Sequence, residues 1–355
     1  MKKIGRRTCL LATGEENPRN GEGAFIRLTD GRILYGFTEY IGDRWNDHAH
    51  ARLTGIVSAD EGETWSPRRV LLECPADAKN IMSLSFLRMG NGDIGMFYIQ
   101  KEQDGTDKLL LVRSDNEGES WSEPVACTDC LEKQDYYVLN NDRVIMLPTG
   151  RILFAAARHT IHEIPGRFMP GEVCFFISDD DGYTWRKTER ELKLPFPDPV
   201  GLQEPGLFVL PDGKVWCYIR TGLGHQWCAY SDDGGETWCD PYPDRRFTSP
   251  RSPMLVKNVC GVTAAVFNPV PEYLTRDPSE PWGRTPYVCA ISRDGGKTFP
   301  TASVYYLEDD RKNGYCYPAL IEGEGYFLCA YYHSLDTDVC LHATVIQKIS
   351  LDELN

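Results

Sequence analysis

The sequence lacks any apolar run long enough to cross a membrane. No stretch approaches the roughly 18 apolar residues that a spanning helix needs. The basic start at residues 1–7 is followed by an apolar segment, Thr8–Thr13, that is far too short for a secretory signal. We therefore expect no membrane partner and a cytoplasmic protein, or a secreted one if a leader has been trimmed.

Positive charge is also scarce. The 355 residues include 38 Lys and Arg against 52 Asp and Glu, which gives a net charge of −14 at pH 7. Such a molecule is repelled by phosphate backbones and by anionic lipids, so nucleic acid is not an expected partner. A small anionic ligand stays open, because a few well-placed arginines recognise it whatever the overall charge.

The cysteines and the linker-forming residues show no organised pattern. The 13 cysteines are odd in number and lack the spacing of a disulfide framework, which favours a reducing compartment. Cys127 and Cys130 form one CxxC without a second pair, so we expect no metal site. Because no Pro-, Gly- or Ser-rich linker divides the chain, residues 1–355 are expected to form one domain.

What the sequence does contain is a short motif that occurs five times. It reads Ser-x-Asp-x-Gly-x-Thr-Trp at residues 58–65, and further copies begin at Ser114, Ser178, Ser231 and Ser292. An Asp or Asn side chain can bond to nearby backbone N–H groups, and glycine tolerates a positive φ. Each copy therefore predicts a hairpin corner, and we expect its aspartate to be structural and not catalytic.

A second hairpin pattern alternates with the first. It consists of two apolar runs around a glycine turn, at Gly31, Gly92, Gly150 and Gly213. Two hairpins per period give four strands per unit, the composition of a propeller blade. The C-terminal segment supplies only three strands, and residues 4–13 are expected to add the fourth and close the ring. The sequence therefore predicts an all-β, six-bladed β-propeller.

The five copies resemble the Asp-box, or BNR repeat, of the sialidase (neuraminidase) superfamily, and the likeness covers the whole chain. It implies a bacterial exo-α-sialidase-like glycoside hydrolase that releases terminal sialic acid, or a related nonulosonic acid, from glycoconjugates. It also implies a sialylated glycan or another acidic sugar as partner, and no metal or organic cofactor. A propeller alone does not fix function. A non-catalytic carbohydrate-binding propeller, and a glycosidase or lyase for another acidic sugar, remain alternatives.

The resemblance assigns three arginines to a clamp for the substrate carboxylate. Arg19 precedes the first blade strand and matches the first of them, with Glu22 close enough to orient it. Arg220, at the end of Tyr218-Ile219-Arg220, matches the second, and Arg284 matches the third. Guanidinium groups suit this role because they bind carboxylates through charge-assisted forks.

The same resemblance implies a tyrosine nucleophile and a glutamate base. Glu204, in Gln203-Glu204-Pro205, resembles the base. Tyr317 resembles the nucleophile, and Tyr315 is the alternative. A neutral phenol is not repelled by an anomeric carbon that already bears a carboxylate, provided that a base takes its proton.

The acid/base is expected in a first-blade loop. The loop holds Asp43 and Asp47; Asp47 matches the family spacing better, and Asp43 stays the alternative. His48 and His50 are placed to contact substrate or to tune the pKa of the neighbouring aspartate.

Two further polar clusters are expected near the centre. Asn141 and Arg143, within the run 140–143, are predicted to contact substrate, although such a turn also forms without a function. Arg158 and His159 end a strand at a similar place.

The chain also departs from better-known bacterial sialidases. It lacks their Arg-Ile-Pro, ends its last box with Phe299, and has His333 where a glutamate often steadies the first arginine. These departures bear on the identity of the substrate and not on the fold.

Overall fold

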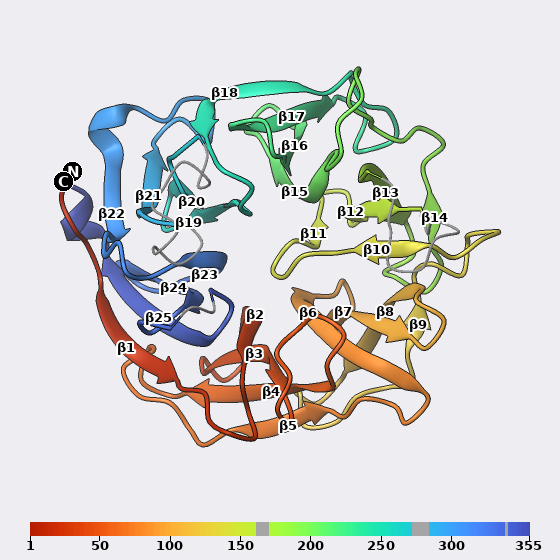
Figure 1. The fold of residues 1–355 in the computed structure, drawn as a ribbon, viewed down its shortest axis with the longest axis horizontal. Helices are drawn as coiled ribbons and strands as arrows, with labels where there is room; N and C mark the ends of the chain where they lie inside the picture. Colours follow the sequence, from red (N-terminus) through yellow and green to blue (C-terminus); the bar gives the residue numbers. More distant parts are fainter. Residues whose placement is uncertain (161–169, 272–283, 338–339) are drawn as a thin grey trace.

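Six β-sheets stand around a central axis in the computed structural model, which describes residues 1–160, 170–271, 284–337 and 340–355 (Figure 1). Helix in these residues is limited to two 3-10 turns, η1 (Thr301–Ser303) and η2 (Leu351–Leu354). No helix in the described ranges is long and apolar enough to cross a membrane. The all-β, six-bladed propeller predicted from the repeats is confirmed.

The blades follow one another along the chain, and neighbouring strands within a blade are antiparallel. Blade 1 contains β2 (Asn20–Arg27), β3 (Ile33–Tyr40), β4 (Ala51–Ser58) and β5 (Arg69–Leu72). Blade 2 contains β6 (Ala78–Arg88), β7 (Ile94–Glu102), β8 (Asp107–Ser114) and β9 (Val125–Ala126). Blade 3 contains β10 (Tyr136–Val138), β11 (Ile145–Met146), β12 (Ile152–His159), β13 (Glu172–Ser178) and β14 (Arg186–Lys187).

The other three blades repeat this arrangement. Blade 4 contains β15 (Gln203–Val209), β16 (Val215–Arg220), β17 (His225–Ser231) and β18 (Tyr242–Thr248). Blade 5 contains β19 (Leu255–Val259), β20 (Val262–Phe267), β21 (Tyr287–Ser292) and β22 (Val304–Glu308). Blade 6 contains β23 (Tyr315–Glu322), β24 (Tyr326–His333), β25 (Ala343–Ser350) and β1 (Arg6–Leu11).

The ring is closed by the two ends of the chain. Strand β1 pairs antiparallel with β25, with Arg6 opposite Lys348 and Leu11 opposite Thr344. The N-terminal strand thus becomes the outermost strand of the last blade (Figure 1). This confirms the expected donor of the missing strand, and it pairs β25 along an edge that would otherwise be exposed.

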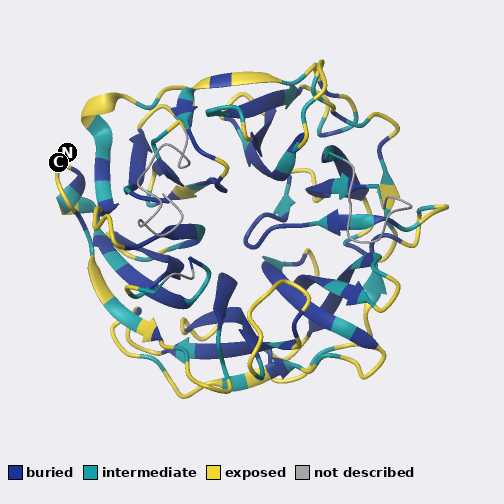
Figure 2. Cartoon of the chain, viewed as in Figure 1, coloured by how far each residue is buried: buried dark blue, intermediate teal, exposed yellow. Residues whose placement is uncertain are grey.

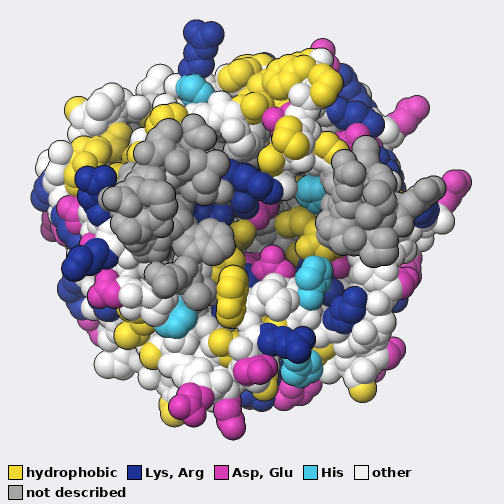
Figure 3. Space-filling view, in the orientation of Figure 1, with side chains coloured by type: hydrophobic (Ala, Val, Ile, Leu, Met, Phe, Trp, Pro, Cys, Tyr) yellow, Lys and Arg dark blue, Asp and Glu magenta, His cyan; other side chains and the backbone are white. Residues whose placement is uncertain are grey.

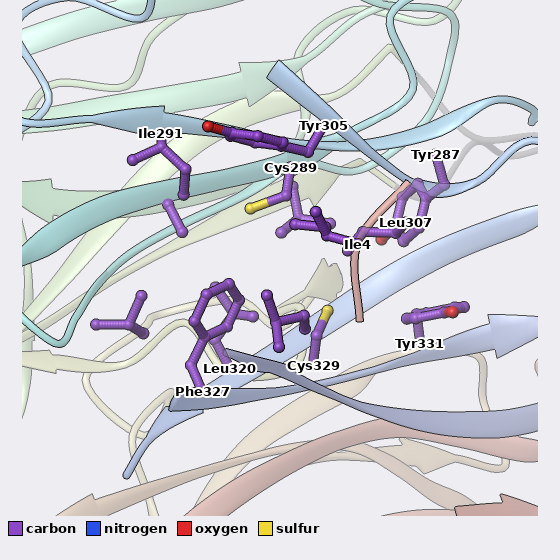
Figure 4. Packing of buried hydrophobic residues seen from close by; sticks show 14 of the residues in the cluster. Ile4, Tyr287, Cys289, Ile291, Tyr305, Leu307, Leu320, Phe327, Cys329 and Tyr331 are labelled. Carbon is purple, nitrogen blue, oxygen red and sulfur yellow. The ribbon is translucent and has the colours of Figure 1, made fainter. Parts of the chain in front are cut away.

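The core of the described residues consists of six large apolar clusters, each between two neighbouring blades. Between blades 5 and 6, for example, Cys289 and Ile291 from β21 face Phe327 and Cys329 from β24 (Figure 4). The inner strands are largely buried, whereas exposure is concentrated in the turns and the outermost strands (Figure 2). Because each blade buries apolar side chains on both of its faces, it depends on its neighbours for stability.

Each Asp-box forms the turn between the last two strands of its blade. In blade 1, Ser58 Oγ donates to Asp60 Oδ1 and accepts from Gly62 N, both at 2.8 Å. Thr64 N donates to Asp60 Oδ1 at 2.8 Å. Gly62 has φ 81°, and a Cβ there would lie 2.7 Å from Leu328 Cδ1 of blade 6. The motif therefore closes its own turn and packs against the preceding blade.

The same bonds recur in the other four boxes. Their glycines approach apolar side chains of the preceding blade, which are Leu34, Leu111, Leu153 and Phe208. Each copy of the repeated sequence thus forms the same kind of contact with the preceding blade.

One loop of blade 3 crosses to the centre of the ring (Figure 1). We call residues 140–143, between β10 and β11, the hub loop. Asn141 Nδ2 donates to the carbonyl oxygens of Gly23 in blade 1 and Pro318 in blade 6, at 2.8 and 3.1 Å. Arg143 donates to the carbonyl oxygens of Glu204 in blade 4 and Met254 of blade 5, both at 2.6 Å.

Asp142 completes these contacts. Its N–H donates to the carbonyl of Leu84 in blade 2 at 3.2 Å, and its carboxylate accepts from Leu320 N at 3.0 Å and Lys257 Nζ at 2.7 Å. The hub loop therefore bonds to every other blade.

Candidate active site

Four inner strands carry the same β-bulge. The register of β2, β6, β15 and β23 shifts where each strand faces the axis. One residue in each bulge has a left-handed backbone: Glu22 (φ 53°), Ser83 (φ 60°), Glu204 (φ 43°) and Tyr317 (φ 56°). Such a conformation costs a non-glycine residue about 1–3 kcal/mol and often marks functional sites. All four residues line one cavity.

The cavity has a volume of about 560 Å³ and opens near the middle of the face seen in Figure 3. Among the residues predicted from the sequence, its lining includes Glu22, Asp47, Glu204, Arg220, Arg284 and Tyr317. These residues come from four blades, and only the closed ring brings them together.

Tyr317, Glu204 and Arg220 form a buried, hydrogen-bonded group. The Tyr317 hydroxyl donates to Glu204 Oε1 at 2.7 Å, within the range expected for a nucleophile and its base. Arg220 Nη1 bonds to Glu204 Oε2 and lies 3.5 Å from the Tyr317 hydroxyl. The expected contact between phenol and carboxylate is present.

The charges of this group follow from its surroundings. Burial opposes ionisation of Glu204, but the Arg220 guanidinium outweighs it and holds the pKa of Glu204 below its ordinary value. Burial, and then the Glu204 charge, raise the pKa of Tyr317 well above its ordinary value. A neutral phenol therefore donates to an ionised carboxylate, which is the arrangement of a nucleophile and an adjacent general base.

Arg284 lies on the other side of Tyr317. Its guanidinium carbon is 5.8 Å from the centre of the Tyr317 ring, and its Nη atoms donate to Cys316 Sγ and the Arg251 carbonyl, at 3.0 and 3.3 Å. The Nε groups of Arg284 and Arg220 are buried without a hydrogen-bond partner among the described residues. Unpaired buried donors are costly, and an anion in the cavity would satisfy the electrostatic demand of both guanidiniums.

Arg19 is placed differently from the prediction. It has no exposed surface and does not line the cavity. Its Nε donates to the Tyr332 hydroxyl at 2.8 Å, Nη1 to Asp47 Oδ1 at 2.6 Å and to the Trp45 carbonyl at 3.1 Å, and Nη2 to Glu22. Direct contact between Arg19 and a substrate carboxylate is not supported in this arrangement, because protein groups already occupy each of its nitrogens.

The first-blade loop brings Asp47 to the cavity and leaves Asp43 away from its lining. The side chain of Asp47 is 51% exposed. Partial desolvation by the surrounding loop opposes its ionisation, but Arg19 outweighs this effect and holds the pKa of Asp47 below its ordinary value. His48 is exposed outside the lining, with its ring 6.3 Å from that of Tyr136, and desolvation lowers its pKa.

Two other predictions need correction. Asn141 and Arg143 do not line the cavity, since their side chains bind backbone carbonyls in the hub loop. They are placed to hold the ring together and not to contact substrate. The alternative nucleophile Tyr315 has no exposed surface and its hydroxyl donates to the Asp310 carbonyl at 3.4 Å, away from the cavity lining.

Among the described residues, no group of three or more His, Cys, Asp or Glu side chains is arranged to hold a metal ion. The chemistry that the cavity offers is anion binding by guanidinium groups and proton transfer between a phenol and carboxyl groups.

Comparison with known proteins places the chain in a family. A model of the BNR repeat-like domain matches residues 57–329. The chain belongs to the BNR repeat-like family of the sialidase superfamily.

Relatives of this BNR repeat protein include a sialidase from Bacteroides fragilis (strain YCH46), which is 22% identical over 232 residues. The match covers 63% of this chain but only 39% of that sialidase. Among solved structures, an intramolecular trans-sialidase from Ruminococcus gnavus bound to oseltamivir carboxylate has a TM-score of 0.75, with 14% identity over 99% of this chain and 98% of the other. A protein of unknown function from Dyadobacter fermentans has the same TM-score, with 18% identity over 97% and 98% of the two chains.

The BNR repeat propeller also places in the cavity residues that the sequence did not single out. Lys101 in β7 is buried, and its Nζ donates to the Tyr136 hydroxyl at 2.9 Å and to Asp107 at 3.3 Å. Ser83 occupies the bulge of β6. Neither has a sequence signal, because a lysine in an alternating strand and a serine in an inner strand are unremarkable. His159 lines the cavity as well, whereas its neighbour Arg158 pairs with acidic residues outside the lining.

Proposed function

We propose that this protein is a retaining exo-glycosidase that hydrolyses the bond to a terminal sialic acid or a related nonulosonic acid. The observation that carries the proposal is the 2.7 Å hydrogen bond from the neutral Tyr317 phenol to the ionised Glu204. The pair lies in a cavity lined by Arg220 and Arg284, which suit a substrate carboxylate.

In the first half of the reaction, Tyr317 Oη attacks the anomeric carbon while Glu204 takes the phenolic proton. The bond to the leaving group breaks and a glycosyl-tyrosine forms. In the second half, water attacks the same carbon, and Tyr317 leaves and recovers its proton from Glu204. Two displacements retain the configuration at the anomeric carbon.

The leaving group also needs a proton donor. Asp47 is the residue that the family resemblance assigns to this role, and it lines the cavity. Glu22 lines the cavity too, and the two carboxyl groups share the guanidinium of Arg19.

A second candidate function is supported by the enclosure of Arg19. Of the three arginines that the resemblance assigns to the clamp, only Arg220 and Arg284 line the cavity. Two arginines still suit the carboxylate of another acidic sugar, for which a glycosidase or lyase would use another catalytic pair. This candidate predicts turnover of uronic acid glycosides and none of sialosides.

The experiment is a panel of fluorogenic glycosides assayed with the wild type, Tyr317→Phe and Tyr315→Phe. The panel contains sialosides, other nonulosonic acid glycosides and uronic acid glycosides. We expect the wild type and Tyr315→Phe to release sialic acid or a close relative, and Tyr317→Phe to lose about 10³-fold or more in kcat. Proton NMR of the first product formed should show retention. Binding of free sialic acid without turnover of any glycoside would refute the proposal in favour of a non-catalytic lectin-like propeller.

A further inference from the structure

One guanidinium in the site faces two carboxyl groups. Arg19 Nη2 bonds to Glu22 Oε1, and Nη1 donates to Asp47 Oδ1 at 2.6 Å. The second oxygen of each carboxyl has no hydrogen bond among the described residues. Arg19 is the only cation that hydrogen-bonds to either carboxyl in the described residues. Lys101 also favours ionisation of Asp47, whereas Glu22 has the like charges of Asp47 and Glu204 nearby. Like charges at such range favour retention of a proton by one of the acids.

The two carboxyl groups differ in how firmly they are held. Glu22 lies in the bulge of an inner strand, with φ 53° and only 5% of its surface exposed, in the same position that Glu204 and Tyr317 occupy in their own blades. Asp47 belongs to the loop between β3 and β4, and its side chain is 51% exposed. Proton transfer needs a donor in a fixed position, which a packed strand provides better than a surface loop.

We propose that Glu22, and not Asp47, is the acid/base of this site, and that Asp47 is a positioning residue that holds Arg19 and its own loop at the cavity edge. This inference rests on the proposed glycosidase function. As Tyr317 forms its bond to the anomeric carbon, the carboxylic acid of Glu22 gives its proton to the glycosidic oxygen and the C–O bond breaks. In the second half, the Glu22 carboxylate takes a proton from the attacking water, which returns Glu22 to its acid form.

The protonation of the two groups agrees with these roles. Burial, reinforced by the charges of Asp47 and Glu204 against the opposing effect of Arg19, raises the pKa of Glu22 to about 7. The pKa of Asp47 is held below its ordinary value by Arg19, so Asp47 is a carboxylate at neutral pH. The ionisable groups that face Glu22 from the surrounding elements are Arg19, Tyr40, Asp47, Glu204, Tyr317 and Tyr332.

The test uses leaving groups of different acidity, because only a poor leaving group needs a proton. Glu22→Gln is expected to lose about 10²–10⁴-fold in kcat/KM on a sialylated lactose and far less on a nitrophenyl sialoside. The wild-type rate on the lactose substrate should fall as the pH rises through about 7, since Glu22 then loses its proton. This alkaline decline should disappear in Glu22→Gln.

Three comparisons interpret the result. Asp47→Asn is expected to lose activity equally on both substrates, which is the signature of a positioning residue. Glu39→Gln removes a buried carboxyl of the same blade outside the cavity lining and controls for the loss of a buried carboxyl group as such. Glu22→Asp keeps a carboxyl and should recover part of the activity on the lactose substrate, so a folding defect in Glu22→Gln does not hide the answer.

The failures of the two proposals are distinguishable. If the leaving-group effect appears in Asp47→Asn and is missing from Glu22→Gln, the assignment of Glu22 is wrong while the glycosidase function stands. If the wild type turns over none of the acidic sugar glycosides, the proposed function itself is wrong.

Discussion

The outer Asp-box turns and the inner bulges both recur around the ring of this propeller. The turns repeat their side chains, whereas the bulges repeat only their backbone conformation. In the Asp-box turns the side chains recur, as in Ser58 and Asp60, because the turn uses them to satisfy its own backbone. In the bulges the left-handed backbone recurs while the side chain changes, from Glu22 to Ser83 to Tyr317. A turn that needs particular side chains leaves a signature in the sequence. A bulge leaves none, and its side chain is free for chemistry.

The hub loop is an exception to this contrast between structural turns and functional bulges. Its Asp142 has the same left-handed backbone (φ 57°), but its side chain bonds to other blades and serves structure. Arg143→Met tests how much the hub loop contributes to the free energy of unfolding. Two charge-assisted bonds to carbonyls are lost from a buried site, each worth about 1.5–3 kcal/mol, so we expect a loss of about 3–5 kcal/mol in the free energy of unfolding. Urea denaturation measures it.

The control for this variant is Arg186→Met, which removes a half-exposed arginine that pairs with Asp179 and Glu236. Exposed ion pairs contribute about 1 kcal/mol or less, so its effect should be much smaller. Equal losses in the two variants would mean that the hub loop contributes no more than a surface contact.

Gly62→Ala tests whether the boxes hold neighbouring blades together. The new Cβ would meet Leu328 Cδ1 at 2.7 Å, and Leu328 is fully buried and cannot easily give way. Because this clash adds to the strain of an alanine at the positive φ of Gly62, we expect the free energy of unfolding to fall by about 2–3 kcal/mol, measured by urea denaturation.

Gly31→Ala separates the clash with the preceding blade from the backbone strain of a positive φ. Gly31 also has a positive φ, of 90°, but a Cβ there meets no atom within 4 Å. It should cost only the backbone strain, about 1–2 kcal/mol. If both variants lose the same stability, the box glycine does not act through the preceding blade.

The smallest expected effect is that of Asp60→Asn, since the second box already has Asn116 and makes equivalent bonds. Hydrogen bonds from Thr64 lower the pKa of Asp60 to about 2, below the value of about 4 in an unfolded chain. The ionised form is therefore favoured by the fold. Its stabilisation is complete above about pH 4 and is lost as the pH falls through about 2.

The variant should consequently melt like the wild type at pH 7 and show a weaker loss of stability between pH 4 and pH 2. Thermal melts across this range measure the difference. An unchanged dependence of the melting temperature on pH would show that ionisation of Asp60 does not stabilise the fold.

The fold was predictable from the sequence because its signal is local. Five copies of one turn specify five blades, and the count of strands at the two ends requires a sixth. Glu204 and Tyr317 were also found, since each stands at the start of an inner strand in a motif that resembles the family's. Nothing in one blade's sequence shows the distance between them, which the closed ring sets at 2.7 Å between the two oxygen atoms.

The errors have a common physical origin. Arg19 looked like a carboxylate ligand, but Tyr332, from the other end of the chain, and Asp47 enclose it. Asn141 and Arg143 looked like substrate contacts because a polar run near a centre suits that role. Their partners are backbone carbonyls in four other blades, and a carbonyl has no sequence signature.

The hub loop also changes how the molecule as a whole should unfold. In a linear repeat array, each unit touches only its neighbours, so stability adds up by nearest-neighbour terms and the ends fray first. Here four residues, 140–143, bond to the other five blades at once, and the N-terminal strand β1 completes the last blade. Detaching any one blade breaks its bonds to the hub loop, and every remaining blade is held by the same loop. The ring therefore has no weak end, and we expect its blades to melt together in one cooperative transition and not one by one.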